Sequence, residues 1–173
     1  GENSVTIPSS QANFAPAVSQ YYNLKISGNR DANTYITLDP TGEIRVSNEF
    51  DISELTFNAT PNAERFVSSG STIVFNGDGD QLINCGYATP TGINFRPFFH
   101  NMVIEGSGTK RVGNPNDNNP ANNFLQIRNN LTLNNATFDT DGNDIRIFGS
   151  WIVNGGQFQP NQDKVVFILD GTT

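Results

Sequence analysis

The segment LQIRNNLTLNNATF, residues 125–138, separates short apolar strands by pairs of asparagines. Its candidate strands are residues 124–128, 131–133 and 136–138. Asparagine tolerates the left-handed backbone of tight corners, and its side chain hydrogen-bonds to nearby amides. Strands this short cannot build a broad sandwich, but they can stack on equivalent strands above and below. The segment therefore predicts a β-solenoid.

The same apolar pattern occurs earlier in the chain. IRVSNEFDISELTF, residues 44–57, aligns with residues 125–138 at an offset of 81, and six apolar positions are shared. Two further matches are YYNLKISG (21–28) with FHNMVIEG (99–106) and IVF (73–75) with VVF (165–167). Repetition of this kind is typical of stacked architectures. We predict one β-solenoid domain over residues 1–173, in which 1–20 end a preceding repeat, 21–98 form repeat unit 1 and 99–173 form repeat unit 2.

The composition indicates an all-β protein. Asn contributes 25 residues, Gly 16, Thr 15 and Ser 12, so turns must be frequent. Residues that favour strands, such as Phe with 13, greatly outnumber strong helix formers. The candidate strands are residues 5–7, 21–27, 34–38, 43–46, 50–52, 55–57, 65–67, 72–75, 99–104, 124–128, 131–133, 136–138, 145–148, 151–153 and 164–169. A two-sheet β-sandwich remains the alternative fold at this point.

Charge and cysteine content exclude several classes of function. The chain carries 17 acidic and 10 basic residues, a formal charge of -7, so its overall field repels a phosphate backbone. Cys85 is the only cysteine, which excludes an intramolecular disulfide and a zinc site built on cysteine pairs. No apolar run has the length of a membrane-spanning helix. We expect neither a nucleic-acid partner nor a transmembrane segment.

One turn has the composition of a metal site. Asp139, Asp141 and Asp144 place three carboxylates in DTDGND, and oxygen ligands are those that calcium prefers. The turn lacks the residue order of an EF-hand loop, and an Asp/Gly-rich β-turn explains the same residues. NGDGD at residues 76–80 resembles part of a calcium-binding repeat but occurs once. Calcium is thus a candidate cofactor at Asp139, Asp141 and Asp144, and no other cofactor is expected.

Two aromatic residues are candidate ligand contacts. Flat aromatic faces suit the C–H groups of sugar rings. Tyr87 lies in the loop GYATPTG, and Trp151 begins a short candidate strand. Burial in the core is the ordinary explanation for an aromatic side chain, so both readings stay open. We expect a glycan or another cell-surface ligand at Tyr87 and Trp151 if the chain binds one.

Four segments resemble a recurrent pattern in large secreted proteins of gliding, polysaccharide-degrading Gram-negative bacteria. They are STIVFNGDGDQLI, FFHNMVIEGSGTK, LQIRNNLTLNNATFDTDGNDIRIFGSWIVNGGQF and KVVFILDG, which together span nearly the whole of residues 21–171. Proteins with this pattern are regarded as right-handed parallel β-helices of the pectin-lyase-like kind. The resemblance implies this fold, a secreted or cell-surface location, and a place among further repeats of a longer chain.

The resemblance supplies no catalytic motif, and the sequence adds none. His100 has no Ser or Cys nucleophile motif near it. Glycosidase or lyase chemistry would require two carboxylates, or calcium and a base, to face one cleft. We therefore expect a non-catalytic extracellular segment that serves adhesion or forms a structural stalk. A carbohydrate-binding module or a β-helix polysaccharide lyase is the alternative.

Overall fold

The computed structural model describes residues 4–8, 19–30, 35–57, 66–68, 70–85, 98–113, 124–141, 143–160 and 165–167. These residues form strands and turns, and none of them lies in a helix, which confirms the all-β prediction. The strands are β1 (Val5–Ile7), β2 (Ser19–Lys25), β3 (Gly28–Arg30), β4 (Ile36–Leu38), β5 (Glu43–Asp51), β6 (Leu55–Phe57), β7 (Phe66–Ser68), β8 (Thr72–Phe75), β9 (Gln81–Asn84), β10 (Phe98–Phe99), β11 (Asn101–Glu105), β12 (Thr109–Gly113), β13 (Phe124–Ile127), β14 (Leu131–Asn134), β15 (Ala136–Asp139), β16 (Asp144–Ile147), β17 (Trp151–Val153), β18 (Gly156–Gln159) and β19 (Val165–Phe167).

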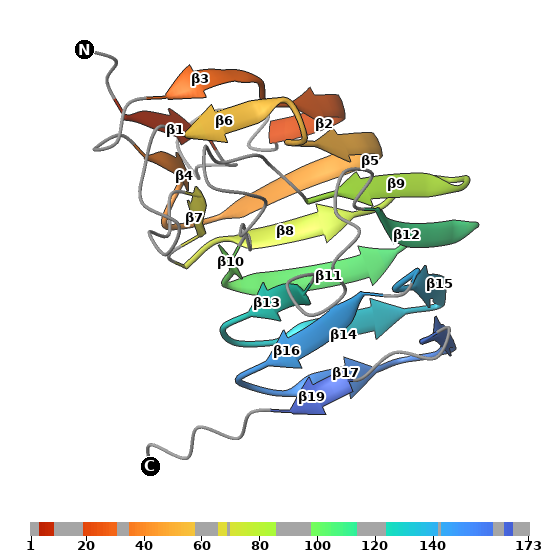
Figure 1. Ribbon diagram of the computed structural model, residues 1–173. Coiled ribbons are helices and arrows are strands. Elements are labelled where there is room, and N and C mark those ends of the chain that lie inside the picture. Colours follow the sequence, from red (N-terminus) through yellow and green to blue (C-terminus); the bar gives the residue numbers. More distant parts are fainter. Residues whose placement is uncertain are drawn as a thin grey trace.

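All the strand pairs in the described part of the chain are parallel. Apart from the pair β5–β9, the paired strands lie three places apart in the chain, so that β1, β4, β7, β10, β13, β16 and β19 form one sheet. We call each run of three successive strands a layer, from the first (β1–β3) to the sixth (β16–β18). Figure 1 shows the layers stacked in sequence order from red to blue. The antiparallel sandwich considered from sequence has a different pairing.

The long strand β5 joins two rows of strands into a single sheet. Its first part, from Glu43 to Val46, pairs with β8, and its last part, from Glu49 to Asp51, pairs with β9. The row from β8 continues through β11 and β14 to β17, and the row from β9 continues through β12 and β15 to β18. In later layers the second and third strands are separate and meet at a corner. The single strand β5 passes through the equivalent corner without a break.

The layers shorten toward the C-terminus. Thr6 and Thr37, partners in neighbouring layers, lie 31 residues apart, whereas Asn134 and Asn154 lie only 20 residues apart. The unit that repeats between hydrogen-bonded neighbours is thus one layer. The boundaries of the two longer repeat units, 21–98 and 99–173, stay a prediction from sequence.

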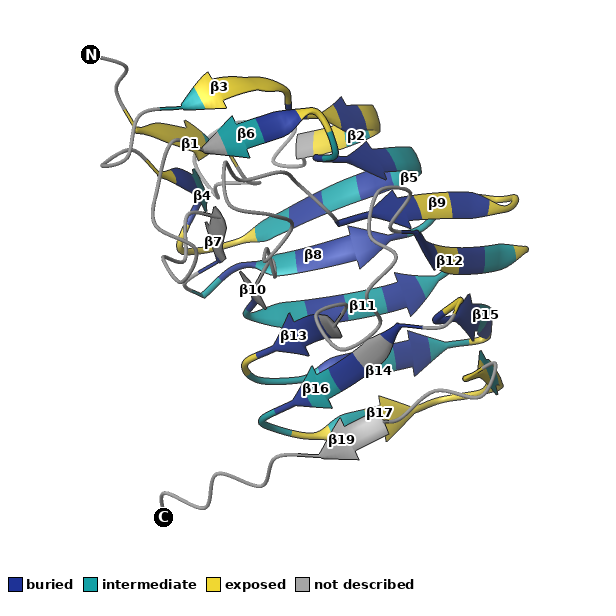
Figure 2. Cartoon of the chain, viewed as in Figure 1, coloured by how far each residue is buried: buried dark blue, intermediate teal, exposed yellow. Residues whose placement is uncertain are grey.

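Apolar residues in register form ladders through the interior. Ile44, Ile73, Met102 and Leu131 occupy the same position of four successive layers, and all four are fully buried. Trp151 follows Leu131 in the same ladder but is partly exposed. Burying each such side chain contributes about 1.5–3 kcal/mol, so the ladders supply most of the stabilisation. Figure 2 shows buried residues concentrated in the middle layers and exposed ones on β3 and β17.

Aromatic rings cluster at two levels of the stack. Phe50, Phe75 and Phe99 pack edge to face, with ring centroids 5.8–6.5 Å apart. Phe138 contacts Phe158 at 6.0 Å in the lower layers. Phe50 and Phe75 thus contact each other from neighbouring layers, as do Phe138 and Phe158.

Asparagines occupy corners, as the sequence predicts. Asn135 has a left-handed backbone, with φ of 54°, between β14 and β15. Side-chain amides also bond from layer to layer: Asn154 Nδ2 donates to Asn134 Oδ1 at 2.8 Å, and Asn129 Nδ2 donates to Asn101 Oδ1 at 2.9 Å. These asparagines link neighbouring layers as well as turning the chain.

Candidate functional site

The outer face of β9, β12 and β15 carries a row of in-register side chains. Arg111 is aligned with Leu82 on one side and with Asp139 on the other. Leu82 is 40% exposed, which is high for an apolar residue in the middle of the stack. The row places a cation, an apolar surface and a carboxylate on neighbouring strands.

A hollow of about 300 Å³ opens on this face. It is lined by Asp80, Gln81, Leu82, Thr109 and Arg111. Its volume lies at the lower end of the range for small-molecule sites, which suits one compact ligand group. The lining combines hydrogen-bond donors and acceptors with one exposed apolar side chain. We call this hollow the outer hollow.

Two hydrogen bonds orient the charged groups of the outer hollow. Arg111 Nε donates to Asp139 Oδ2 at 3.1 Å, and the backbone N–H of Thr109 donates to Asp80 Oδ1 at 2.8 Å. The bond to Asp139 uses only the Nε donor, so the planar guanidinium is held while its two Nη groups keep their donors. Asp139 is almost completely buried, and its negative charge offsets that of Arg111.

The turn predicted to bind calcium uses its first carboxylate for these internal contacts. Besides the bond to Arg111, Asp139 accepts the backbone N–H of Asp141 through Oδ1 at 2.8 Å. Asp141 is exposed and has a left-handed backbone, with φ of 49°. The side chain of Asp144 lies outside the described residues. No three His, Cys, Asp or Glu side chains of the described ranges gather as metal ligands, and calcium at Asp139, Asp141 and Asp144 stays a prediction.

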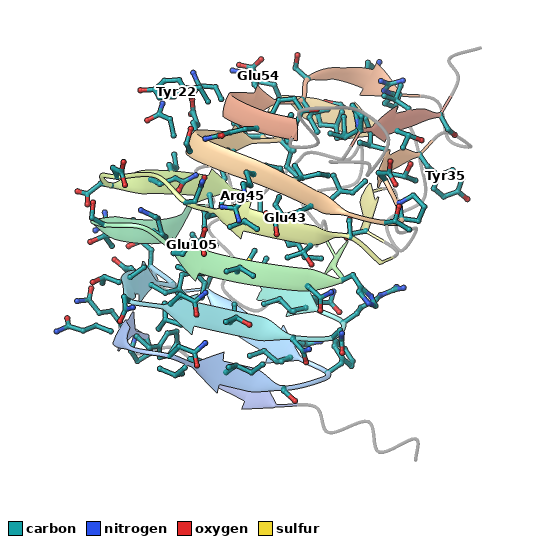
Figure 3. All side chains as sticks on the ribbon, turned by 180° about the vertical axis from the view of Figure 1, so that it is seen from behind. Tyr22, Tyr35, Glu43, Arg45, Glu54 and Glu105 are labelled. Carbon is teal, nitrogen blue, oxygen red and sulfur yellow. The ribbon has the colours of Figure 1, made fainter. Side chains whose placement is uncertain are left out.

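Of the two predicted aromatic contacts, the structure describes Trp151. Trp151 begins β17, packs against the core, and meets Phe158 edge to face with ring centroids 4.6 Å apart. Tyr87 lies outside the described residues. Figure 3 shows two other tyrosines, Tyr22 and Tyr35, on the surface near the first layers, where Tyr22 is 69% exposed. A ligand role for Tyr87 and Trp151 therefore stays a prediction.

Beneath the outer hollow lies a buried lysine. Lys110 is the partner of Gln81 and Phe138 in neighbouring strands, and its side chain is fully buried. Nζ donates to the backbone oxygens of Gly77 at 2.7 Å and Gly79 at 2.9 Å, and also to that of Ser107. Burial lowers the pKa of Lys110, while the nearby Asp78 and Asp80 carboxylates act in the opposite direction. The oxygens of the NGDGD segment thus contact an internal cation.

A buried amide completes this corner. Gln81 Oε1 accepts the N–H of Gly77 at 3.3 Å, and Gln81 Nε2 donates to the backbone oxygen of Val46 at 2.8 Å. The contact to Val46 ties the third layer to the second, while Lys110 ties the fourth to the third. At these two interior positions, Lys110 Nζ and both polar atoms of the Gln81 side chain therefore have hydrogen-bond partners.

Two further ion clusters join layers on the outside. Arg45 bridges Glu43 on its own strand and Glu105 two strands away, at 2.8 Å for the Glu105 contact (Figure 3). Val74, the register partner of Arg45 on the strand between them, is buried. Lys25 contacts Glu54 at 2.8 Å and the buried Asp51 at 3.4 Å. Burial alone would raise the pKa of Asp51. Hydrogen bonds from Ser53 and the positive charge of Lys25 outweigh burial and hold this pKa below its ordinary value. Both clusters join strands of different layers.

The residues of the outer hollow escape a reading based on apolar alternation. Leu82 and Arg111 of the outer hollow, and Lys110 beneath it, lie in two strands absent from the candidate strands, because polar Gln81 and Lys110 take interior positions. One signal in the sequence could have indicated the strand that contains Lys110. Lys110 and Val112 lie two residues apart, hence on the same side of a strand, directly after the turn GSG.

Comparisons of the chain with protein-family models, curated proteins and solved structures find no match. Among the residues described, no helix has the length and apolar character needed to cross a membrane.

Proposed function

We propose that this chain is a right-handed parallel β-helix that acts as a non-catalytic, adhesive or structural segment of a larger secreted or cell-surface protein. The parallel pairing of strands that lie three places apart, with the exception of β5–β9, supports the helical course. Right-handed crossover connections between parallel strands are strongly preferred, which supports the handedness. The resemblance of residues 71–83 and 125–158 to secreted β-helical proteins supports the location.

Cross-layer bonding is the observation that carries the structural role. One sheet runs from β1 to β19, and at strand spacings of about 4.8 Å its six steps span about 29 Å. Side chains reinforce this axis at Asn134–Asn154, at Arg45–Glu105 and at Lys110. A stack bonded in this way transmits load along its axis through many small, repeated contacts.

The charged groups of the outer hollow support a non-catalytic role. Asp80 accepts a backbone N–H and Asp139 holds Arg111, so both carboxylates stabilise the fold. Acid–base cleavage of a glycosidic bond instead needs a protonated and an ionised carboxyl placed on either side of that bond.

Forced unfolding between the two termini tests the structural role. A layered stack should lengthen in successive steps of one layer, which release about 70–110 Å of chain for 20–31 residues. A single low-force event without intermediate steps would contradict a load-bearing stack. A parallel assay for chain cleavage on neutral and acidic polysaccharides, with and without calcium, should give no product.

The outer hollow favours carbohydrate binding as the second candidate function. Leu82 offers an apolar surface, and Asp80, Thr109 and Arg111 offer acceptors and donors for hydroxyl groups. A glycan array followed by titration of the best ligand tests this role. Arg111→Gln should weaken binding at least about tenfold, as loss of a charged hydrogen bond predicts, while Arg128→Gln on another face leaves it unchanged. Equal affinities for the two variants would contradict binding in the outer hollow.

A further inference from the structure

A positive charge occupies the interior of the stack where the next layers carry aromatic rings. Lys110 is aligned with Phe138, and Phe138 with Phe158, so all three belong to one inward ladder. The Lys110 side chain has no exposed surface. An ammonium group in such a position requires partners for each of its donors.

The partners come from the corners of two neighbouring layers. Residues 76–80 connect β8 to β9 and supply the oxygens of Gly77 and Gly79, at 2.7 and 2.9 Å. Residues 106–108 connect β11 to β12 and supply the oxygen of Ser107. An ammonium has three N–H donors, so these three oxygens satisfy it completely.

Glycines make this arrangement of oxygens accessible. Gly106 has φ of 85°, and a Cβ added there would lie 2.3 Å from the Gly77 oxygen. Gly108 has φ of 74°, and its Cβ would meet the Gly79 backbone at 2.4 Å. The two corners therefore approach each other too closely for any side chain at these positions.

Negative charge surrounds the same corner. Asp78 and Asp80 belong to the connection of residues 76–80, and both carboxylates favour the charged form of Lys110. Backbone oxygens together with carboxylates are the ligand set with which proteins bind hard cations.

We propose that residues 76–80 and 106–108 form a cation site whose occupant is the protein's own Lys110 ammonium. The site, which we call the cation corner, joins the third and fourth layers through a covalently supplied charge. The three oxygens match the three N–H donors of a primary ammonium group. When the Lys110 side chain is removed, the cation corner should therefore accept a small primary ammonium ion. This inference goes beyond the adhesive or structural role and does not depend on it.

Chemical rescue of a lysine variant tests the proposal. Lys110→Ala removes both the ammonium and its stem, Lys110→Met fills the stem's space without a charge, and Lys25→Met is the matched loss of an exposed lysine. The Tm of each full-length variant is measured in n-propylammonium chloride and in tetramethylammonium chloride at equal ionic strength. Tetramethylammonium carries the same charge but has no N–H to donate.

Lys110→Ala should lower the Tm by at least about 5 °C, because the backbone oxygens of Gly77, Gly79 and Ser107 lose their donor, and Lys25→Met by less than about 2 °C. Propylammonium at about tenfold excess over its Kd should raise the Tm of Lys110→Ala by about 3–5 °C more than tetramethylammonium does. Lys110→Met and the unaltered chain should respond equally to both salts.

Equal responses of Lys110→Ala to the two salts overturn the proposal, as does a Tm within about 1 °C of the unaltered chain. Should Lys110→Ala not fold in ordinary buffer, the yield of refolding from urea in each salt replaces the Tm. A higher yield in propylammonium then supports the cation corner, and equal yields contradict it.

Discussion

Two corners of the stack solve the same geometric problem with different chemistry. The cation corner of the third and fourth layers uses connections of residues 76–80 and 106–108, with Lys110 inside. In the fifth and sixth layers the corresponding connections shrink to Asn135 and to residues 154–155, which we call the asparagine corner. There the interior ladder carries Phe138 and Phe158 in place of Lys110.

The length of the connection explains this difference. The longer loops can turn backbone oxygens inward, which makes room for a charge and satisfies it. At the asparagine corner the N–H of Asn135 donates to the oxygen of Gly155 at 3.1 Å, so the backbone bonds from layer to layer. In this stack the interior position is therefore polar beside the longer connections, as at Gln81 and Lys110, and aromatic beside the shorter ones, as at Phe138 and Phe158.

Removing an aromatic ring beside the asparagine corner should have the largest effect. Phe138 is fully buried and contacts Phe158, so Phe138→Ala leaves a cavity in the interior ladder. The expected loss of unfolding free energy is about 3–5 kcal/mol, measured by urea denaturation. A loss below about 1 kcal/mol would mean that the ring is not part of the packed interior.

A side chain inside the cation corner should be the next most damaging change. Gly106→Ala forces a left-handed backbone on alanine and brings its Cβ against the Gly77 oxygen. We expect a loss of about 2–3 kcal/mol in the same denaturation experiment. Gly79→Ala is the control, since its Cβ would meet nothing within 4 Å and its φ is not left-handed.

Acid pH should weaken the charged contact of Asp51, which lies outside both corners. The pKa of Asp51 is lowered on folding, so its contribution is present above the unfolded pKa of about 3.9 and is lost as pH falls through the folded value. Asp51→Asn should cost about 1–2 kcal/mol at neutral pH and progressively less below about pH 4. A pH-independent difference between the two proteins would contradict this assignment.

The smallest effect is expected at the surface of the asparagine corner. Asn154→Ala removes one exposed amide contact to Asn134 and should cost about 0.5 kcal/mol. Hydrogen exchange of the backbone N–H of residue 154, which donates to the backbone oxygen of Leu133, reports whether the local strand pairing loosens. Faster exchange with a Tm lowered by no more than about 2 °C is the expected result, and a loss as large as that of Phe138→Ala would contradict a surface role.

The sequence predicts the first two strands of most layers because their apolar residues alternate, as in 43–46 and 131–133. It misses most of the third strands, namely β3, β9, β12 and β18, where polar or glycine residues interrupt the alternation. Of the three sequence matches, the one between residues 21–28 and 99–106 joins strands of one sheet, β2 and β11, whereas residues 44–46 and 125–127 lie in β5 and β13, which belong to different sheets. Layers of 31 and 20 residues cannot match at a fixed short offset.

The candidate sites follow the same division. Asp139 ends β15 directly before the turn at Asp141, and its contact with Arg111 joins two neighbouring layers and has no signal in the local sequence. Lys110 is interior only because residues 76–80 of another layer supply its acceptors. Sequence patterns report which residues of one strand share a face, whereas contacts between layers depend on stacking.

Distances between spin labels along the first sheet test the layered architecture most directly. In a Cys85→Ala background, label pairs at Thr37 and Arg146 and at Thr6 and Arg146 follow one in-register row across four and five strand steps. The parallel stack predicts backbone separations of about 19 Å and about 24 Å, which differ by one strand spacing. Equal separations, or a shorter one for the Thr6 pair, would contradict it.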